Sequence, residues 1–262
     1  MRRRLGLLLT AMILALLLAS GVALAVTKIG TNGPDTLRGT NRDDNLVGRG
    51  GNDVLFALAG EDNLLGGEGK DWVLGGNERR PFGGDKNLLG GPGNDGVVGG
   101  IGSDNVSGDS GNDFLLGDNG SDSAVVGGEG KDLVEGGRGA DRIGGGEGTD
   151  ILIEGALDNP WKDDLSGGDG NDIFVADNVP ATKDIVSCGE GFDRVLADRK
   201  DAVASDCERV RVVRGSVEDV FAQETAFFET VPPAVTEFFG TWETFFSTFF
   251  EEQLAPDPTV GG

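Results

Sequence analysis

Aspartates recur at nearly constant spacing through the middle of this 262-residue chain, and each stands at the same place in a short pattern. The pattern is GGxGxDxUx, in which U is an apolar residue, and its copies run from Gly30 to Val175. A carboxylate is a hard oxygen ligand of the kind that calcium prefers. The aspartates at the sixth position are therefore candidate metal ligands, and we read one copy as carrying a lysine, Lys86, at that place. They are Asp35, Asp44, Asp53, Asp62, Asp71, Asp95, Asp104, Asp113, Asp122, Asp132, Asp141, Asp150, Asp163 and Asp172.

Glycines at the first, second and fourth positions of the pattern suit a tight turn. They allow positive φ and close backbone approach, which a turn needs if its carbonyl groups are to point at an ion. We therefore expect turn carbonyls to supply further ligands, above all in the complete copies. These begin at Gly66, Gly90, Gly99, Gly127, Gly136, Gly145 and Gly167.

The remaining positions of each copy predict a short strand whose eighth residue points inward. Two copies then form one coil with a turn at each edge. The sequence predicts an all-β fold, a parallel β-roll or flattened β-helix solenoid, over residues 26–175. Its expected core residues are Leu37, Leu46, Leu55, Leu64, Val73, Leu88, Val97, Val106, Leu115, Ala124, Val134, Ile143, Leu152, Leu165 and Phe174.

The copies resemble the calcium-binding nonapeptide repeats of the RTX family. The resemblance covers residues 30–175. It implies a β-roll that holds several Ca²⁺ ions between neighbouring turns, through the aspartates and the turn carbonyls.

Repulsion within the rows of aspartates predicts that the ions are needed for folding. Coils stacked about 4.8 Å apart place like charges side by side, at about 1 kcal/mol per pair in water and roughly 3 to 4 kcal/mol at an effective dielectric of 20. The inward side chains contribute roughly 1.5 to 3 kcal/mol each, which does not offset this repulsion together with the backbone entropy. We expect a largely disordered metal-free chain that folds when calcium binds.

Alternate copies place their aspartates along opposite edges of the coil. The first edge carries an unbroken set, which we call the odd row: Asp35, Asp53, Asp71, Asp95, Asp113, Asp132, Asp150 and Asp172. The even row, along the other edge, contains Lys86 and has Arg42 and Trp161 where a glycine belongs. We expect tighter calcium binding in the odd row, with the Lys86 ammonium either replacing an ion or lying in solvent.

Residues 1–25 read as a secretory signal peptide. Three arginines precede an apolar stretch from Leu5 to Leu18, and Ala23-Leu24-Ala25 is a small-x-small cleavage site. An uncleaved membrane anchor is the alternative. With cleavage, we expect a secreted chain, extracellular or at the cell surface, with no membrane span in its mature form.

Residues 176–214 read as decayed repeats that form a terminal cap. Gly189, Gly191 and Asp193 still fit the pattern. The segment holds the chain's two cysteines, Cys188 and Cys207, which we expect to form a disulfide in oxidising surroundings; two free thiols are the alternative. The arrangement resembles the ends of secreted calcium-binding repeat proteins of actinobacterial type.

Residues 215–252 predict an amphipathic helical tail rich in phenylalanine, followed by a flexible end at 253–262. Pro232 and Pro233 divide the tail into two helices. Residues 216–252 could dock on the coil, bind a protein partner or mediate self-association.

Composition excludes several function classes. A formal net charge of −23 argues against nucleic acid as a partner. With no histidine, the chain lacks the usual catalytic triad and zinc-hydrolase sites, although carboxylate-only catalysis stays open. Little chain lies outside the repeats, so we expect no enzyme, and we expect a structural, surface or adhesive protein. A secreted effector or enzyme accessory that recruits a partner through its tail is the alternative.

Overall fold

The computed structural model describes residues 24–77, 84–85, 87–155, 159–178 and 181–213. The signal peptide predicted at 1–25 lies almost entirely outside these residues, and the tail at 215–252 and the end at 253–262 lie wholly outside them. Within the described residues, no helix is long and apolar enough to cross a membrane.

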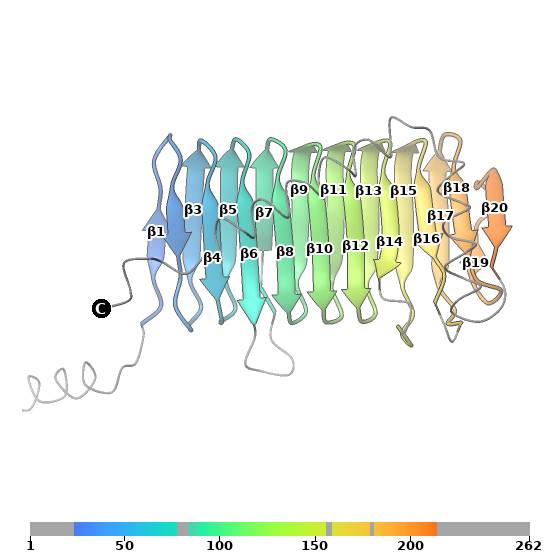
Figure 1. Cartoon of the computed structure of the whole chain (residues 1–262), viewed down its shortest axis with the longest axis horizontal. Helices are drawn as coiled ribbons and strands as arrows, with labels where there is room; N and C mark the ends of the chain where they lie inside the picture. Colours follow the sequence, from blue (N-terminus) through green and yellow to red (C-terminus); the bar gives the residue numbers. More distant parts are fainter. Residues whose placement is uncertain (1–23, 78–83, 86, 156–158, 179–180, 214–262) are drawn as a thin grey trace, which may run out of the picture.

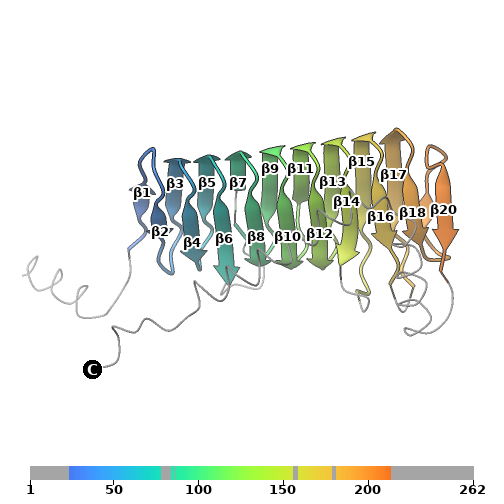
Figure 2. The ribbon, with the colours of Figure 1, turned by 45° about the horizontal axis from the view of Figure 1, so that its top comes forward.

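Twenty strands form two parallel sheets of ten strands each, which face one another as the two layers of a solenoid (Figures 1 and 2). The predicted all-β parallel β-roll is confirmed. The first sheet contains β1 (Thr27–Ile29), β3 (Asn45–Gly50), β5 (Asn63–Glu68), β7 (Asn87–Pro92), β9 (Asn105–Gly111), β11 (Ala124–Gly130), β13 (Arg142–Gly148), β15 (Asp164–Gly170), β17 (Ile185–Glu190) and β19 (Ala202–Val203). The second contains β2 (Thr36–Arg38), β4 (Val54–Leu58), β6 (Trp72–Asn77), β8 (Gly96–Ile101), β10 (Phe114–Asn119), β12 (Leu133–Arg138), β14 (Ile151–Gly155), β16 (Ile173–Ala176), β18 (Arg194–Ala197) and β20 (Arg209–Val212).

The core is a thin layer of apolar side chains between the two sheets, to which each sheet contributes one file. Each coil stacks on the next with position eight in register, as where Leu115 pairs with Val97 on one side and Val134 on the other. All three side chains are fully buried. Fourteen of the fifteen predicted core residues belong to this cluster. The register therefore holds along the length of the solenoid, and it brings the turns of successive coils together at each edge.

The prediction that Ala124 lies in the core was wrong by one position. Val125 lies in the core instead and pairs with Val106, while Ala124 pairs with Asn105 one place earlier. The extra residue is Ser123, which follows Asp122 and donates its backbone N–H and its hydroxyl to the Asp104 carbonyl oxygen. The strand can accept one additional residue beside the aspartate without losing the coil register.

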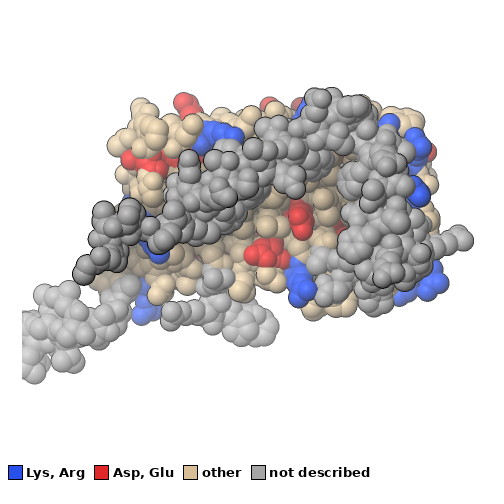
Figure 3. Space-filling view, viewed as in Figure 1, with Lys and Arg blue, Asp and Glu red and all other residues tan. Residues whose placement is uncertain are grey.

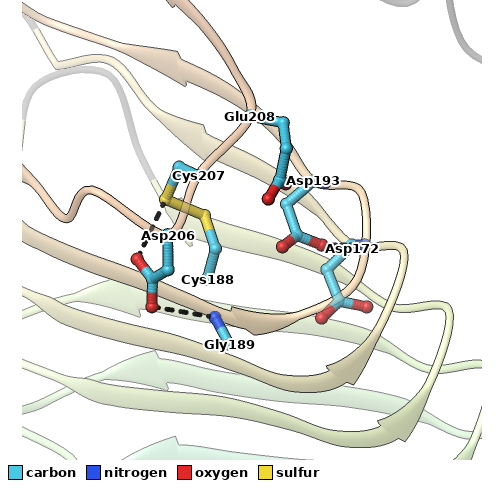
Figure 4. The surroundings of a disulfide bond; sticks show 7 residues. All are labelled: Asp172, Cys188, Gly189, Asp193, Asp206, Cys207 and Glu208. Atoms are coloured by element: carbon cyan, nitrogen blue, oxygen red, sulfur yellow. Dashed lines mark hydrogen bonds between the residues drawn. A yellow bond between two sulfur atoms is a disulfide. The ribbon is translucent and has the colours of Figure 1, made fainter.

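Strands β17 to β20 extend both sheets beyond residue 175. Val186 and Val195 extend the apolar core there, together with the buried Cys188. Cys188 and Cys207 form the predicted disulfide, which joins β17 to the segment between β19 and β20 (Figure 4). The decayed repeats thus form regular coils, and the disulfide ties the last of them together.

Candidate calcium site in the turns

The predicted ligand aspartates form two continuous rows, one along each edge of the solenoid. Within a row, the backbone N–H of each aspartate donates to Oδ1 of the aspartate one coil further on, at 2.5 to 3.1 Å. All fourteen predicted aspartates lie in these rows. The odd row is Asp35, Asp53, Asp71, Asp95, Asp113, Asp132, Asp150, Asp172 and Asp193, and the even row is Asp44, Asp62, Asp85, Asp104, Asp122, Asp141, Asp163, Asp184 and Asp201.

Asp85, and not Lys86, occupies the sixth position of its copy. The Asp62 N–H donates to Asp85 Oδ1 at 3.0 Å, and the Asp85 N–H donates to Asp104 Oδ1. Lys86 itself lies outside the described residues. The even row is therefore an unbroken series of carboxylates, and the assignment of Lys86 to the sixth position was wrong.

The second carboxylate oxygen, Oδ2, lies inside the turn. In most members of the rows this atom is buried and has no hydrogen-bond partner among the described residues. Most row aspartates are buried, and the acidic side chains that Figure 3 shows on one face of the molecule are separate from one another. A buried acceptor without a donor is costly, so these oxygens need a positively charged partner, either a cation or a proton. They belong to Asp53, Asp62, Asp71, Asp95, Asp104, Asp113, Asp122, Asp132, Asp141, Asp150, Asp172 and Asp193.

A turn carbonyl lies beside these carboxylate oxygens. A Cβ placed on Gly108 would lie 2.3 Å from Asp113 Oδ2 and 2.5 Å from the carbonyl oxygen of Gly127, the equivalent glycine of the next coil. The same arrangement recurs for every carbonyl predicted as a ligand. A Cβ on the first glycine of the preceding coil would lie 2.2 to 2.5 Å from Oδ2 of that coil's own aspartate. It would also lie 2.1 to 2.7 Å from the carbonyl oxygens of Gly66, Gly90, Gly99, Gly127, Gly136, Gly145 and Gly167, respectively.

The glycines at positions two and four have the left-handed backbone that their turns require. Gly146 has φ of 126° and Gly148 has φ of 137°. A Cβ on Gly148 would stand 1.5 Å from the carbonyl oxygen of Gly130 in the preceding coil, so only glycine allows this stacking distance. Position two is less strict, because Arg49, Leu58, Asp109 and Asp118 adopt positive φ there.

Burial raises the pKa of most row aspartates in the metal-free coil. For most of them the charge of a neighbouring aspartate raises the pKa further, whereas the N–H that donates to Oδ1 lowers it. The carboxyl groups thus resist ionisation near neutral pH unless a positive charge is present. The pKa reaches about 6 for Asp62, Asp71, Asp104 and Asp141, about 7 for Asp95, Asp113, Asp132, Asp150 and Asp172, and about 8 for Asp122 and Asp163.

The rows continue past the residues that the pattern marked. Asp193 follows Asp172 in the odd row, and Glu208 takes the next place by accepting the Asp193 N–H at 2.8 Å (Figure 4). In the even row, Asp184 and Asp201 continue in the same way. The spacing of acidic and apolar residues near positions 184, 193 and 201 is the signal that could have placed these three among the candidates.

A parallel solenoid with two rows of buried carboxylates in glycine turns defines a class of calcium-binding repeat protein. This chain belongs to the RTX calcium-binding nonapeptide repeat family. The family matches residues 29–64, 48–78, 89–124, 125–152 and 162–178, which together cover half of the chain. No curated protein and no solved structure gave a significant match.

The described residues fit calcium. The donor set consists of carboxylate and carbonyl oxygens, which suits a hard cation, and the space inside each turn is one that a Cβ would fill. RTX repeats of this kind bind Ca²⁺, and the number of buried aspartates accords with several ions. The repeats are typical of secreted and surface proteins and form a fold that is typically structural and not catalytic.

Proposed function

We propose that this chain is an extracellular structural protein that binds several calcium ions between adjacent coils and folds on binding them. The observation that carries the proposal is the recurring pair in the turns: a buried aspartate oxygen without a donor, beside a carbonyl oxygen of the next coil. A calcium ion placed between coils supplies positive charge to both.

We assign the ligands by the rows. The carboxylates are those of the fourteen aspartates predicted from the pattern, together with Asp85, Asp184 and Asp193, and the carbonyls are those of the first glycines of the next turns. Hydrogen bonds to Oδ1 already hold these carboxylates in place in every coil after that of Asp35, so the chain positions Oδ2 before an ion arrives. This fixed orientation reduces the ordering cost of binding.

The rows also support a coupling between binding and folding. Each buried carboxylate resists ionisation, and its neighbours in the row lie one coil away. Bound calcium offsets both the cost of burying each carboxylate and the repulsion between neighbouring carboxylates, so the free energy of binding becomes free energy of folding. Calcium outside cells reaches the levels at which weak extracellular-type sites fill, so the chain would fold after export.

The solenoid supports a structural role, as a stiff spacer, a surface component or an adhesive module. Its described residues form one thin core between two sheets, and in them the acidic groups gather in the turns. This arrangement serves to hold ions and keep the coils stacked.

Calorimetric titration of the purified protein with calcium tests the proposal. We expect several ions per chain, and small-angle scattering should show a compact rod with calcium and an expanded chain in chelator. Absence of calcium binding, or the same scattering profile in both conditions, would refute the proposed function.

A further inference from the structure

One coil carries a glutamate where the even-row turns elsewhere carry a small residue. Glu154 lies in β14. The strand register places it opposite Gly136 of β12 on one side and opposite Ala176 of β16 on the other. Its side chain is 1 % exposed and therefore points into the turn. The nonapeptide pattern has no carboxylate at this position.

Two turns at this end of the even row are longer than the turns that directly precede them, as is the earlier turn between β6 and β7. β12 ends at Arg138 and β13 begins at Arg142, whereas β14 ends at Gly155 and β15 begins at Asp164. The connection from β16 to β17 is similarly long, from Ala176 to Ile185. The longer turns leave room for a side chain that would not fit in an ordinary repeat.

Glu154 meets two row aspartates there. One carboxylate oxygen from each of Glu154, Asp163 and Asp184 lies within 4.8 Å of the other two, and all three side chains are buried. Oxygens bound to a single calcium ion at about 2.3 to 2.6 Å lie no more than about 5 Å apart. The three oxygens are thus already at a separation that one ion can bridge.

Two buried amides hold this cluster from the outside. Asn159 Nδ2 donates to Asp163 Oδ2 at 2.9 Å, and Asn178 Nδ2 donates to Asp184 Oδ2 at 3.2 Å and to Glu154 Oε2 at 3.4 Å. Glu154 Oε1 is left buried without a hydrogen-bond partner among the described residues. The amides orient the carboxylates but bring no charge to offset them.

Glu154, Asp163 and Asp184 are buried together, and their hydrogen bonds come from neutral groups: the backbone N–H groups of Asp141 and Asp163 and the two amides. A buried group of like charges needs either shared protons or a cation. A calcium ion accepts such a set of oxygen ligands, and it would satisfy the Glu154 oxygen that has no donor among the described residues.

We propose that Glu154 binds calcium together with Asp163 and Asp184, as an additional ligand that the nonapeptide pattern does not supply. The ion joins the turn between β14 and β15 to the turn between β16 and β17. Asn159 and Asn178 are positioning residues. This inference rests on the proposed function and deepens it, because Asp163 and Asp184 belong to the even row and Glu154 is a ligand that the repeat pattern does not contain.

Counting calcium ions in the purified protein and in Glu154→Ala tests this site. The fold accepts alanine at this place, since Ala57 and Ala176 occupy the equivalent positions of other coils. We expect Glu154→Ala to lose one ion per chain by calorimetry and native mass spectrometry. Glu147→Ala, which replaces an exposed glutamate one strand earlier, should keep the wild-type count.

Glu154→Gln serves as a second variant of nearly unchanged shape and should also lose the ion. If both variants keep the wild-type count, the three carboxyl groups share protons and the site is refuted. If neither variant folds, a wild-type crystal grown in calcium decides the matter by the presence or absence of an ion among the three oxygens. A wild-type chain that binds no calcium at all would refute the proposed function as well, so the two failures are distinguishable.

Discussion

Replacing Asp113 by asparagine should change stability in opposite directions with and without calcium. The introduced side chain would keep an oxygen to accept the Asp95 N–H, and its amide would place a donor near the Gly127 carbonyl oxygen, where Asp113 now has only an acceptor. In the metal-free coil this change removes a buried carboxylate that has no cation. In the calcium-bound coil it removes a charged ligand. We therefore expect Asp113→Asn to stabilise the metal-free fold and to weaken calcium binding.

The magnitude follows from the pKa of Asp113, which burial raises from 3.8 to about 7. A shift of about three pH units corresponds to about 4 kcal/mol lost from the metal-free fold above pH 7, as an upper value because neighbouring groups relax. The folded state holds its proton more tightly than the unfolded chain, so this loss grows as pH rises. It is absent below about pH 3.8, about 2 kcal/mol at about pH 5 and complete above about pH 7. The gain from asparagine should follow the same course.

An osmolyte titration measures this effect even in a chain that, as we predict, does not fold without calcium. Trimethylamine N-oxide favours burial, so the concentration at the folding midpoint in chelator reports the metal-free stability. At pH 8 we expect Asp113→Asn to fold at lower osmolyte than wild type, and at pH 5 the difference should shrink by about half. With calcium, the binding midpoint should rise at least about tenfold.

Asp169→Asn is the matched control, because Asp169 is exposed and the charge change is the same. It should move neither midpoint appreciably. If Asp113→Asn folds no more easily than wild type at pH 8, the buried carboxylates do not oppose folding and the expected stabilisation is refuted.

Three further substitutions test the turns and the end of the solenoid, each by thermal unfolding with calcium present. Gly148→Ala should destabilise the fold by about 3 kcal/mol, because its Cβ would overlap a carbonyl oxygen of the preceding coil. Gly144→Ala is the control and should be tolerated, because its Cβ would lie 3.5 Å from the nearest atom. Equal losses of stability in the two variants would contradict the close stacking of the turns. Arg49→Gly should stabilise by about 0.5 to 1 kcal/mol, since Arg49 is exposed and adopts φ of 87°, and a loss of stability would show that this backbone is unstrained. Replacing Cys188 and Cys207 together by serine should cost about 3 kcal/mol, because the disulfide joins residues 19 positions apart, and the number of bound ions should not fall.

The fold was predictable from the pattern because glycine, aspartate and the apolar residue recur together. Within nine residues, the copy that contains Asp113 and Leu115 predicts a turn from its glycines, a ligand at Asp113 and a core position at Leu115. Fourteen row aspartates and the disulfide partners follow from the spacing and from the cysteine count.

The errors arose where the chain carries one extra residue beside an aspartate. Counting back two places from Leu88 leads to Lys86, but Asn87 is held beside Leu88 by a ladder of asparagine amides. Asn87 Nδ2 donates to Asn63 Oδ1, and Asn105 Nδ2 donates to Asn87 Oδ1, both at 3.0 Å. The ladder fixes the strand, so Asp85 reaches the row across an additional residue.

The role of Glu154 could not be predicted from the pattern for a different reason. The residues around it in the sequence do not indicate whether its side chain points into the turn or into solvent. Its direction depends on the lengths of the connections before Asp163 and before Asp184, which are far from it in sequence. Only the stacked coils bring the three carboxylates together.

Far-ultraviolet circular dichroism of the purified protein at neutral pH tests most directly whether the solenoid depends on calcium. The chain in chelator is compared with the same sample after addition of millimolar calcium. We predict a disordered spectrum that converts to a strand spectrum when calcium is added. An equally strong strand spectrum in chelator would contradict this dependence, because the solenoid would then form without any ion between its coils.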